Sequence, residues 1–337
     1  MNSPSDTPLL RVDDVTTVFR LRDGRDVPAV NHVSFSIAPQ ETLGLVGESG
    51  SGKSVTALSI MRLVMPPGRI TSGRVEFEGR DLLTISEREM RAVRGRRIGF
   101  VFQEPMVALN PVYTIGYQIT ETLGVHGLAR GDTAKRRAIE LLEAVRVPDP
   151  SRRFSEYPHQ LSGGLRQRAM IALALCAEPS LLIADEPTTA LDVTVQAEIL
   201  DLLRDLRARF SLSLLLISHD LGVIAEMADR VAVMYCGRIV EDAPVARLFS
   251  APSHPYTRGL LACAPGTDAT VGTRLVAIPG SVPGLDQLPQ GCAFAPRCGS
   301  RMDACAQVPG ITTLADGHHV RCFLHGTSVE SDGGARS

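Results

Sequence analysis

The chain has 337 residues and a formal net charge of −2, and no run of lysine or arginine stands out. Nucleic acid is therefore a poor first guess for its partner, because phosphate-tracking surfaces are basic. Residues 1–10 lack a basic start followed by an apolar stretch, and the apolar runs are far shorter than the roughly 18 residues that cross a bilayer. We expect a cytoplasmic protein with a large core and an appended part, whose contact with any membrane goes through a partner.

Residues 9–38 alternate between apolar and polar side chains around a turn at Asp23-Gly24, which predicts short antiparallel strands. A strand-like run over 41–47 and a helix-like run over 53–63 follow, and residues 47–54 between them match the pattern G-x-x-x-x-G-K-[ST]. The loop residues expected to contact a nucleotide are Gly47, Ser49, Gly50, Gly52, Lys53 and Ser54.

This strand, loop and helix predict a phosphate-binding loop. Backbone N–H groups that turn inward at a helix N-terminus supply donors and partial positive charge for a polyanion. Lys53 is the expected point charge for the β- and γ-phosphates, and the hydroxyl of Ser54 is the expected Mg²⁺ ligand.

Two further strands are expected over 73–79 and 97–103, and Gln103 ends the second one. Ligands of open α/β sheets bind at the carboxyl ends of the strands, so this amide is well placed to sense a phosphate or a metal. An equally good interpretation is that Gln103 caps a turn before Glu104-Pro105.

Residues 111–158 carry apolar positions at helical spacing, which we interpret as packing against a core. Ser162, Gly163 and Gly164 then precede an apolar helix over 169–176. Bare backbone donors and a capping serine at a helix start predict a second anion cradle.

The run 181–186 is a buried strand that ends in two carboxylates, Asp185 and Glu186. Asp185 is expected to hold Mg²⁺, and Glu186 to orient and deprotonate the water that attacks the γ-phosphate, which favours hydrolysis over binding alone. A strand over 213–218 delivers His219 to the same edge, where a γ-phosphate would lie, although a histidine at a strand end is usually structural.

Four of the seven cysteines crowd the end of the chain: Cys292, Cys298, Cys305 and Cys322. Five, six and sixteen residues separate them, and in a cytoplasmic protein such a cluster suggests metal rather than disulfides. Four thiolates suit Zn²⁺ or a [4Fe–4S] cluster, and the spacing alone does not decide between them.

The motifs described above, from the phosphate loop to His219, resemble in their order and spacing the full motif set of an ATP-binding cassette ATPase. The resemblance covers roughly residues 8–250. The resemblance implies an α/β fold: a phosphate-loop NTPase (RecA-like) core with an antiparallel β subdomain and an α-helical subdomain inserted at about 109–175, within a cassette domain over 1–250. It also implies a head-to-tail dimer, in which the phosphate loop of one subunit and the Ser162 cradle of the other enclose each ATP.

The resemblance adds two residues to the expected ATP site. Asp192, in the run Leu191-Asp192, matches a position of the family's nucleotide site. Phe19 resembles the aromatic residue on which the family stacks adenine, although a phenylalanine in the core is nearly as good an interpretation.

Residues 251–337 resemble the C-terminal extension of oligopeptide and dipeptide importer ATPases, through the run 251–260, the run 278–284 and the four cysteines. That branch implies a second ATPase subunit, identical or homologous, two membrane permease subunits and an external peptide-binding protein. The chain would then lie at the cytoplasmic face of the inner membrane, with residues 103–117 receiving the coupling helices of the permeases.

The same branch implies a [4Fe–4S] cluster on the four cysteines, in a structural role. Zn²⁺ is the first alternative, and thiols that share no ligand are the second. Arg297, beside Cys298, would offset the negative charge of such a cluster.

Two other functions fit parts of the sequence. A soluble cassette ATPase that acts on ribosomes or DNA usually has two cassettes or a long coiled-coil insertion before the Ser162 motif, and neither is present. An iron–sulfur redox sensor with a secondary ATPase activity is the third hypothesis.

Overall fold

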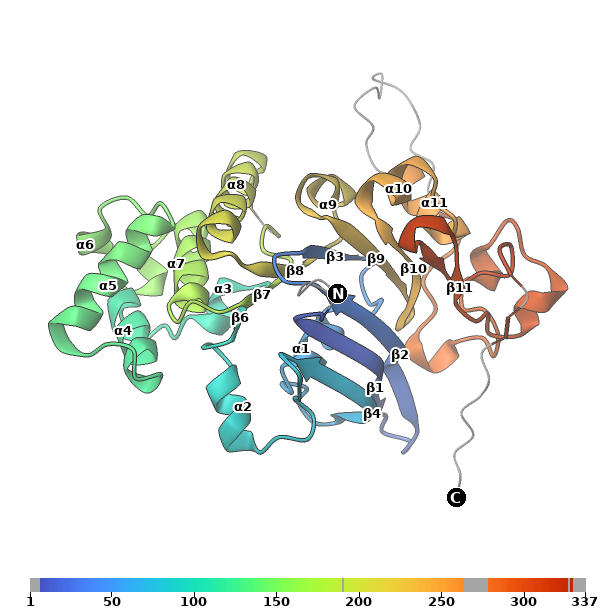
Figure 1. The fold of residues 1–337 in the computed structure, drawn as a ribbon, viewed down its shortest axis with the longest axis horizontal. Helices are drawn as coiled ribbons and strands as arrows, with labels where there is room; N and C mark the ends of the chain where they lie inside the picture. Colours follow the sequence, from blue (N-terminus) through green and yellow to red (C-terminus); the bar gives the residue numbers. More distant parts are fainter. Residues whose placement is uncertain (1–6, 190, 264–277, 327, 330–337) are drawn as a thin grey trace, which may run out of the picture. The chain divides into compact units, whose positions relative to one another are not determined.

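The computed structural model describes residues 7–189, 191–263, 278–326, 328 and 329 (Figure 1). The chain divides into two compact units. Unit 1 comprises residues 1–10, 37–42 and 77–217, and unit 2 comprises residues 11–36, 43–76 and 218–337. Each unit therefore combines segments that are distant in the sequence.

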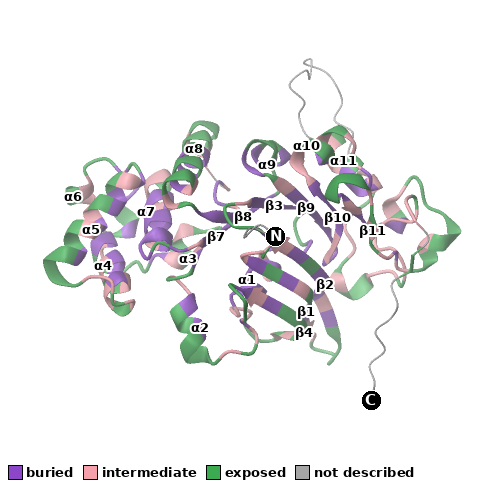
Figure 2. Cartoon of the chain, in the orientation of Figure 1, coloured by how far each residue is buried: buried purple, intermediate pink, exposed green. Residues whose placement is uncertain are grey.

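Unit 1 contains three parallel strands in the order β8-β7-β6. They are β6 (Ile98–Val101), β7 (Leu181–Asp185) and β8 (Ser213–Ser218). Every residue of β7 and β8 is buried (Figure 2), as expected for central strands of a parallel sheet. Because the strands are parallel, their carboxyl ends meet at one edge, and Gln103 and Glu186 follow two of those ends.

The helices of unit 1 are α2 (Glu87–Val93), α3 (Pro105–Ala108), α4 (Ile115–Val125), α5 (Gly131–Ala144), α6 (Pro150–Arg153), η1 (Pro158–Gln160), α7 (Gly163–Leu175) and α8 (Val193–Phe210), and β5 (Arg80–Asp81) is a short strand. Helices α4, α5 and α7 pack together (Figure 1). In α5 the buried residues recur at three- and four-residue spacing, so the apolar stripe expected from the sequence is the packed face.

One sheet of unit 2 has the order β2-β1-β4. Its strands are β1 (Leu10–Arg20), β2 (Asp26–Ile37) and β4 (Gly68–Phe77). Leu21 N–H donates to the Arg25 oxygen at 2.8 Å and closes the tight turn between β1 and β2, with Gly24 at a φ of 87°. So short a connection makes these two strands antiparallel, and the turn predicted at Asp23-Gly24 is present.

A second set of strands in unit 2 has the order β11-β12-β10-β9-β3. The strands are β3 (Thr42–Val46), β9 (Arg230–Tyr235), β10 (Arg238–Pro244), β11 (Thr312–Thr313) and β12 (His319–Val320). β3 and β9 are parallel, whereas β9, β10, β12 and β11 pair antiparallel. The cysteine-rich end of the chain therefore extends this sheet by two short strands, which the sequence did not lead us to expect.

The helices of unit 2 are α1 (Lys53–Ile60), α9 (Leu221–Met227), α10 (Val245–Ser250), α11 (Pro255–Cys263), η2 (Leu285–Gln287), η3 (Ala295–Arg297), η4 (Asp303–Ala306) and η5 (Ala315–Gly317). Helix α1 is shorter than the expected 53–63, because Arg62 has a left-handed φ of 51°. Among the described residues, no helix has the length and apolar character needed to span a membrane.

A buried carboxylate fastens the C-terminal segment to β10. Glu241 is 1% exposed and accepts hydrogen bonds from the backbone of Ser253 at 2.6 Å and of His254 at 2.9 Å. It also bonds Nε2 of His318 at 2.7 Å. Three partners satisfy a charge that would otherwise be costly to bury.

Candidate nucleotide site

The phosphate loop lies between β3 and α1, as the sequence predicts. Gly52 has a φ of 105°, and a Cβ there would lie 2.3 Å from the backbone oxygen of Ala29. Only glycine fits this position. Gly52 also precedes α1 without any side-chain cap, and helix N-termini of this kind are suited to anions.

The ammonium group of Lys53 crosses the loop. Its Nζ donates to the carbonyl oxygen of Gly47 at 2.8 Å and to that of Glu48 at 3.1 Å. Lys53 is buried, whereas Ser54 beside it is half-buried. The basic group expected to meet the phosphates thus already lies inside the loop.

Glu48 links the phosphate loop to residues that lie more than 200 positions later in the sequence. Its backbone N–H donates to the hydroxyl of Tyr256 at 2.8 Å. Its carboxylate accepts from both terminal nitrogens of Arg297, at 2.8 and 3.1 Å. We expected Arg297 to offset the charge of a metal cluster, but its guanidinium group pairs with the phosphate loop.

His219 and Phe19, two further residues of unit 2, were also expected at the nucleotide site. His219 is exposed immediately after β8, and Asp220 next to it caps α9 by accepting from the backbone of Gly222 at 2.8 Å. Phe19 is half-buried in β1, and its ring lies so close to Gly68 that a Cβ there would be 2.7 Å away. One ring edge is therefore packed, while part of the ring remains accessible.

In unit 1 the carboxylate of Glu186 has two polar side chains around it. Gln103 Nε2 donates to it at 3.2 Å and the Thr189 hydroxyl donates at 2.8 Å. Glu186 has a left-handed φ of 46°, and its N–H is tied to the oxygen of Ile217 at 3.0 Å. Asp185, the last residue of β7, is 6% exposed.

The second predicted cradle is at the N-terminus of α7. Ser162 is exposed, and its hydroxyl accepts from the backbone of Leu165 at 3.4 Å. Gly164 lies against α8, where a Cβ would meet Val195 at 2.8 Å. Asp192 caps α8 by accepting from the backbone of Val195 at 2.9 Å. The starts of α7 and α8 therefore lie side by side, each with a polar cap.

The four C-terminal cysteines line one small cavity together with His254 and Phe294; they are Cys292, Cys298, Cys305 and Cys322. Burial raises the pKa of Cys292 to about 11 and also raises that of Cys322. Among the residues that the structure describes, no three histidine, cysteine or acidic side chains are close enough to hold a single metal ion. The thiols thus share a cavity without forming a compact one-ion site.

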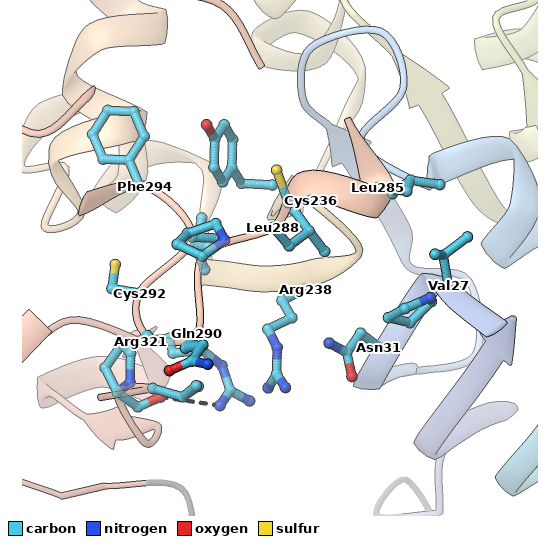
Figure 3. A pocket seen from close by; sticks show the side chains of 18 of the residues that line it. Val27, Asn31, Cys236, Arg238, Leu285, Leu288, Gln290, Cys292, Phe294 and Arg321 are labelled. Carbon is cyan, nitrogen blue, oxygen red and sulfur yellow. Dashed lines mark hydrogen bonds between the residues drawn. The ribbon is translucent and has the colours of Figure 1, made fainter. Parts of the chain in front are cut away.

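A larger cavity of about 310 Å³ adjoins this one, and His254, Cys292 and Phe294 line both. Figure 3 shows Asn31 and Arg238 on one side of it and Arg321 and Gln290 on the other. When the side-chain amide of Asn31 is oriented with its oxygen toward Arg238, that oxygen accepts a hydrogen bond from the guanidinium group at 3.2 Å. This cavity could not be expected from the sequence, because its lining comes from six separate places along the chain.

Sequence reasoning also missed the contacts made by Thr189, Tyr256 and Arg297. The three-residue spacing from Glu186 to Thr189 was a usable signal, because such a spacing in a turn brings a hydroxyl back to a carboxylate. Nothing in the sequence linked Tyr256 or Arg297 to Glu48, which lies more than 200 residues earlier.

Comparison with known proteins gives a consistent result. Residues 30–189 match the family model described as ABC transporter, and residues 240–305 match the one described as oligopeptide/dipeptide transporter, C-terminal region. A protein of Brucella abortus (strain 2308), named as a peptide import ATP-binding protein, is 52% identical over 315 residues, which cover 94% of each chain. The oligopeptide transport ATP-binding protein AppD of Bacillus subtilis (strain 168) is 52% identical over 319 residues, covering 94% of this chain and 97% of that one.

A solved structure supports the same grouping. The dimeric ATP-binding cassette MJ0796, bound to ADP and Pi, matches with a TM-score of 0.63 and 28% identity, covering 70% of this chain and 98% of that one.

Proposed function

This chain belongs to the ATP-binding cassette transporter family and is an ATPase subunit for peptide import, and from that premise we propose that each ATP is held between two cassettes. The phosphate loop of one cassette and the Ser162, Gly163 and Gly164 cradle of another would grip the triphosphate from opposite sides. Two glycine-rich helix starts in one chain, at α1 and α7, support this proposal, because helix N-termini suit anions. ATP binding would then close the pair, and hydrolysis would open it.

We assign the phosphate contacts to the backbone of the loop and to Lys53. The position of the loop before α1 and of the Lys53 ammonium group within it supports this assignment. The loop backbone contacts are those of Gly47, Ser49, Gly50 and Gly52. Phe19 is assigned to adenine through the accessible part of its ring, and Asp192 to the facing side of the nucleotide.

Mg²⁺ fits the donors assigned to it, because it prefers hard oxygen ligands. These ligands are the Ser54 hydroxyl, the Gln103 amide oxygen and the Asp185 carboxylate. When bound, the ion offsets the charge of the phosphates. The chain's own groups still have to orient the phosphates and move the proton of the attacking water.

Glu186 is proposed as the base that takes this proton. Gln103 and Thr189 donate to its carboxylate and hold it in one orientation, as a general base requires. His219 is proposed to contact the γ-phosphate from the end of β8. The arrangement around Glu186 is the observation that carries the proposed hydrolytic role.

The test compares Glu186→Gln with the wild type and with Glu140→Gln, a matched change at an exposed position. We expect Glu186→Gln to bind ATP normally and to hydrolyse it about 10²–10⁴-fold more slowly. The control should keep the wild-type rate. Undiminished turnover in Glu186→Gln would remove Glu186 from the role of base.

Peptide transport by this subunit requires partners that cross the membrane. We propose a second ATPase subunit, two permease subunits and an external peptide-binding protein, with this chain at the cytoplasmic face of the inner membrane. The segment from α3 to α4 supports a permease contact, because it exposes large apolar side chains. These are Met106, Val107, Val112, Tyr113 and Tyr117, with exposed fractions of 42%, 70%, 68%, 43% and 44%.

We further propose a cassette domain over 1–250, with a helical subdomain inserted at about 109–175, followed by an extension over 251–337. The helices α4 to α7 and the cysteine-lined cavity support these limits. The ribosome, DNA and redox-sensor hypotheses are not favoured, since the relatives are named for peptide import.

The four cysteines are proposed to hold a [4Fe–4S] cluster as a structural clamp, with Zn²⁺ as the alternative. All four line one cavity, which supports a shared ligand. A single zinc ion would need the four sulfurs within bonding distance of one point, and no described group of side chains is so placed. Four cysteine thiolates are the usual ligands of a [4Fe–4S] cluster.

Chemical analysis tests the cluster. We expect about four iron and four sulfide ions per chain in anaerobically purified protein. Cys298→Ser should lose them and unfold at a lower temperature, whereas Cys263→Ser, outside the cavity, should retain them. Stoichiometric zinc would select the alternative, and a metal-free chain of unchanged stability would overturn both.

A further inference from the structure

The C-terminal extension contacts the phosphate loop at Glu48. Tyr256 bonds its backbone N–H and Arg297 bonds its carboxylate, while Lys53 bonds its carbonyl oxygen. Every polar group of Glu48 thus has a partner, and two of these partners come from the extension. All four residues belong to unit 2.

Arg297 is held in place by its own surroundings. Its side chain is 5% exposed and that of Glu48 is 30% exposed. Nε donates to the carbonyl oxygen of Pro279 at 2.9 Å, and the guanidinium carbon lies 5.9 Å from the ring centres of both Tyr235 and Phe294. A fixed, planar donor of this kind matches a carboxylate with two parallel bonds.

Tyr256 is equally well fixed. It is fully buried, and its ring packs against Tyr235 at 4.6 Å and Phe294 at 5.4 Å between centres. Burial raises the pKa of its hydroxyl, which therefore stays neutral. A neutral phenol can accept the N–H of Glu48 at 2.8 Å without adding negative charge to the loop.

A carboxylate inside a phosphate loop opposes the function of that loop. Its charge repels a triphosphate, and this repulsion is strong in a partly buried site. A paired guanidinium cancels the charge and returns the loop to net attraction through Lys53 and the backbone. The pair of Glu48 and Arg297 therefore bears on ATP affinity as well as on stability.

We propose that Arg297 and Tyr256 are positioning residues of the ATP site: they fix the phosphate loop through Glu48, and Arg297 neutralises its carboxylate. The extension is then part of the nucleotide site. Cys298 follows Arg297 directly, so a ligand on the four cysteines would support the loop through this arginine.

The test measures the dissociation constant of fluorescently labelled Mg-ATP for full-length variants. Arg297→Met leaves the Glu48 carboxylate uncompensated and should weaken binding about tenfold or more. Glu48→Gln in the same chain removes that carboxylate, so the double variant should return to within about threefold of the wild type. Arg301→Met is the matched control, an exposed arginine of the same extension, and should bind normally.

Rescue by Glu48→Gln separates positioning from mere support of the fold, because lost packing around Arg297 would not be restored by a change in the loop. If Arg297→Met binds ATP as the wild type does, or if the double variant stays as weak as Arg297→Met, the proposal is overturned.

Should Arg297→Met aggregate, Arg297→Lys provides the same comparison, since it keeps a charge but loses the paired donors. We then expect faster amide exchange at residues 47–49 and intermediate affinity. Wild-type exchange and affinity in Arg297→Lys would count against the proposal.

Discussion

The buried carboxylate of Glu241 allows the sharpest prediction about stability. Its Oε1 accepts from Ser253 N–H and from His318 Nε2, and its Oε2 accepts from His254 N–H. In Glu241→Gln one of these oxygens becomes an NH₂ group. Either orientation of the amide therefore leaves one backbone N–H facing a donor, and the bonds that remain lose their charge assistance.

A buried donor without an acceptor costs about 1–3 kcal/mol, and weaker neutral hydrogen bonds add about 1 kcal/mol. We expect Glu241→Gln to lower the free energy of unfolding by about 2–4 kcal/mol in urea titrations followed by circular dichroism. Amide exchange at Ser253 and His254 should accelerate. A urea midpoint that moves no further than in the exposed control Glu140→Gln would refute this reasoning.

Three further outcomes are expected. Gly52→Ala should abolish ATP binding, measured by equilibrium dialysis, because the new Cβ would lie 2.3 Å from a backbone oxygen at a left-handed φ; normal binding would show that the loop can relax. Burial, with smaller contributions from two basic neighbours, lowers the pKa of His254 to about 3. Below about pH 6.5 the unfolded chain therefore binds a proton that the folded chain does not bind. Relative to His254→Asn, the free energy of unfolding should fall by about 1.4 kcal/mol for each unit by which the pH is lowered from about 6 to 4. Parallel pH profiles of the two proteins would contradict this. Thr189→Val should lower kcat for ATP about tenfold with little change in KM, because it removes a donor that orients Glu186; a change in KM alone would place Thr189 in binding instead.

The phosphate loop could be predicted because all its determinants are contiguous. Eight residues with a strand before them and a helix after them define the turn, the donors and the cation together. The approach of Gln103 to Glu186 was predictable for a different reason. They are 83 residues apart, yet each follows a parallel strand, and parallel strands end at the same edge.

The contacts of the extension could not be predicted in this way. Arg297 and Glu48 are 249 residues apart, and no regular periodicity connects them. Strand β12 has two residues, too few to show alternation, and pairs with β10 through a long-range contact. Helix α1 also ended earlier than expected, because a left-handed residue cannot be recognised from the apolar pattern alone.

The proposed pairing of cassettes is tested most directly by the mass of Glu186→Gln in the presence of ATP, measured by light scattering. We predict that ATP doubles the mass, and that adding Ser162→Arg, which places a bulky side chain in the cradle, keeps the mass at that of one chain. A dimer that forms equally well with Ser162→Arg, or that forms without ATP, would contradict the proposal that the cradle of one cassette closes over the nucleotide of another.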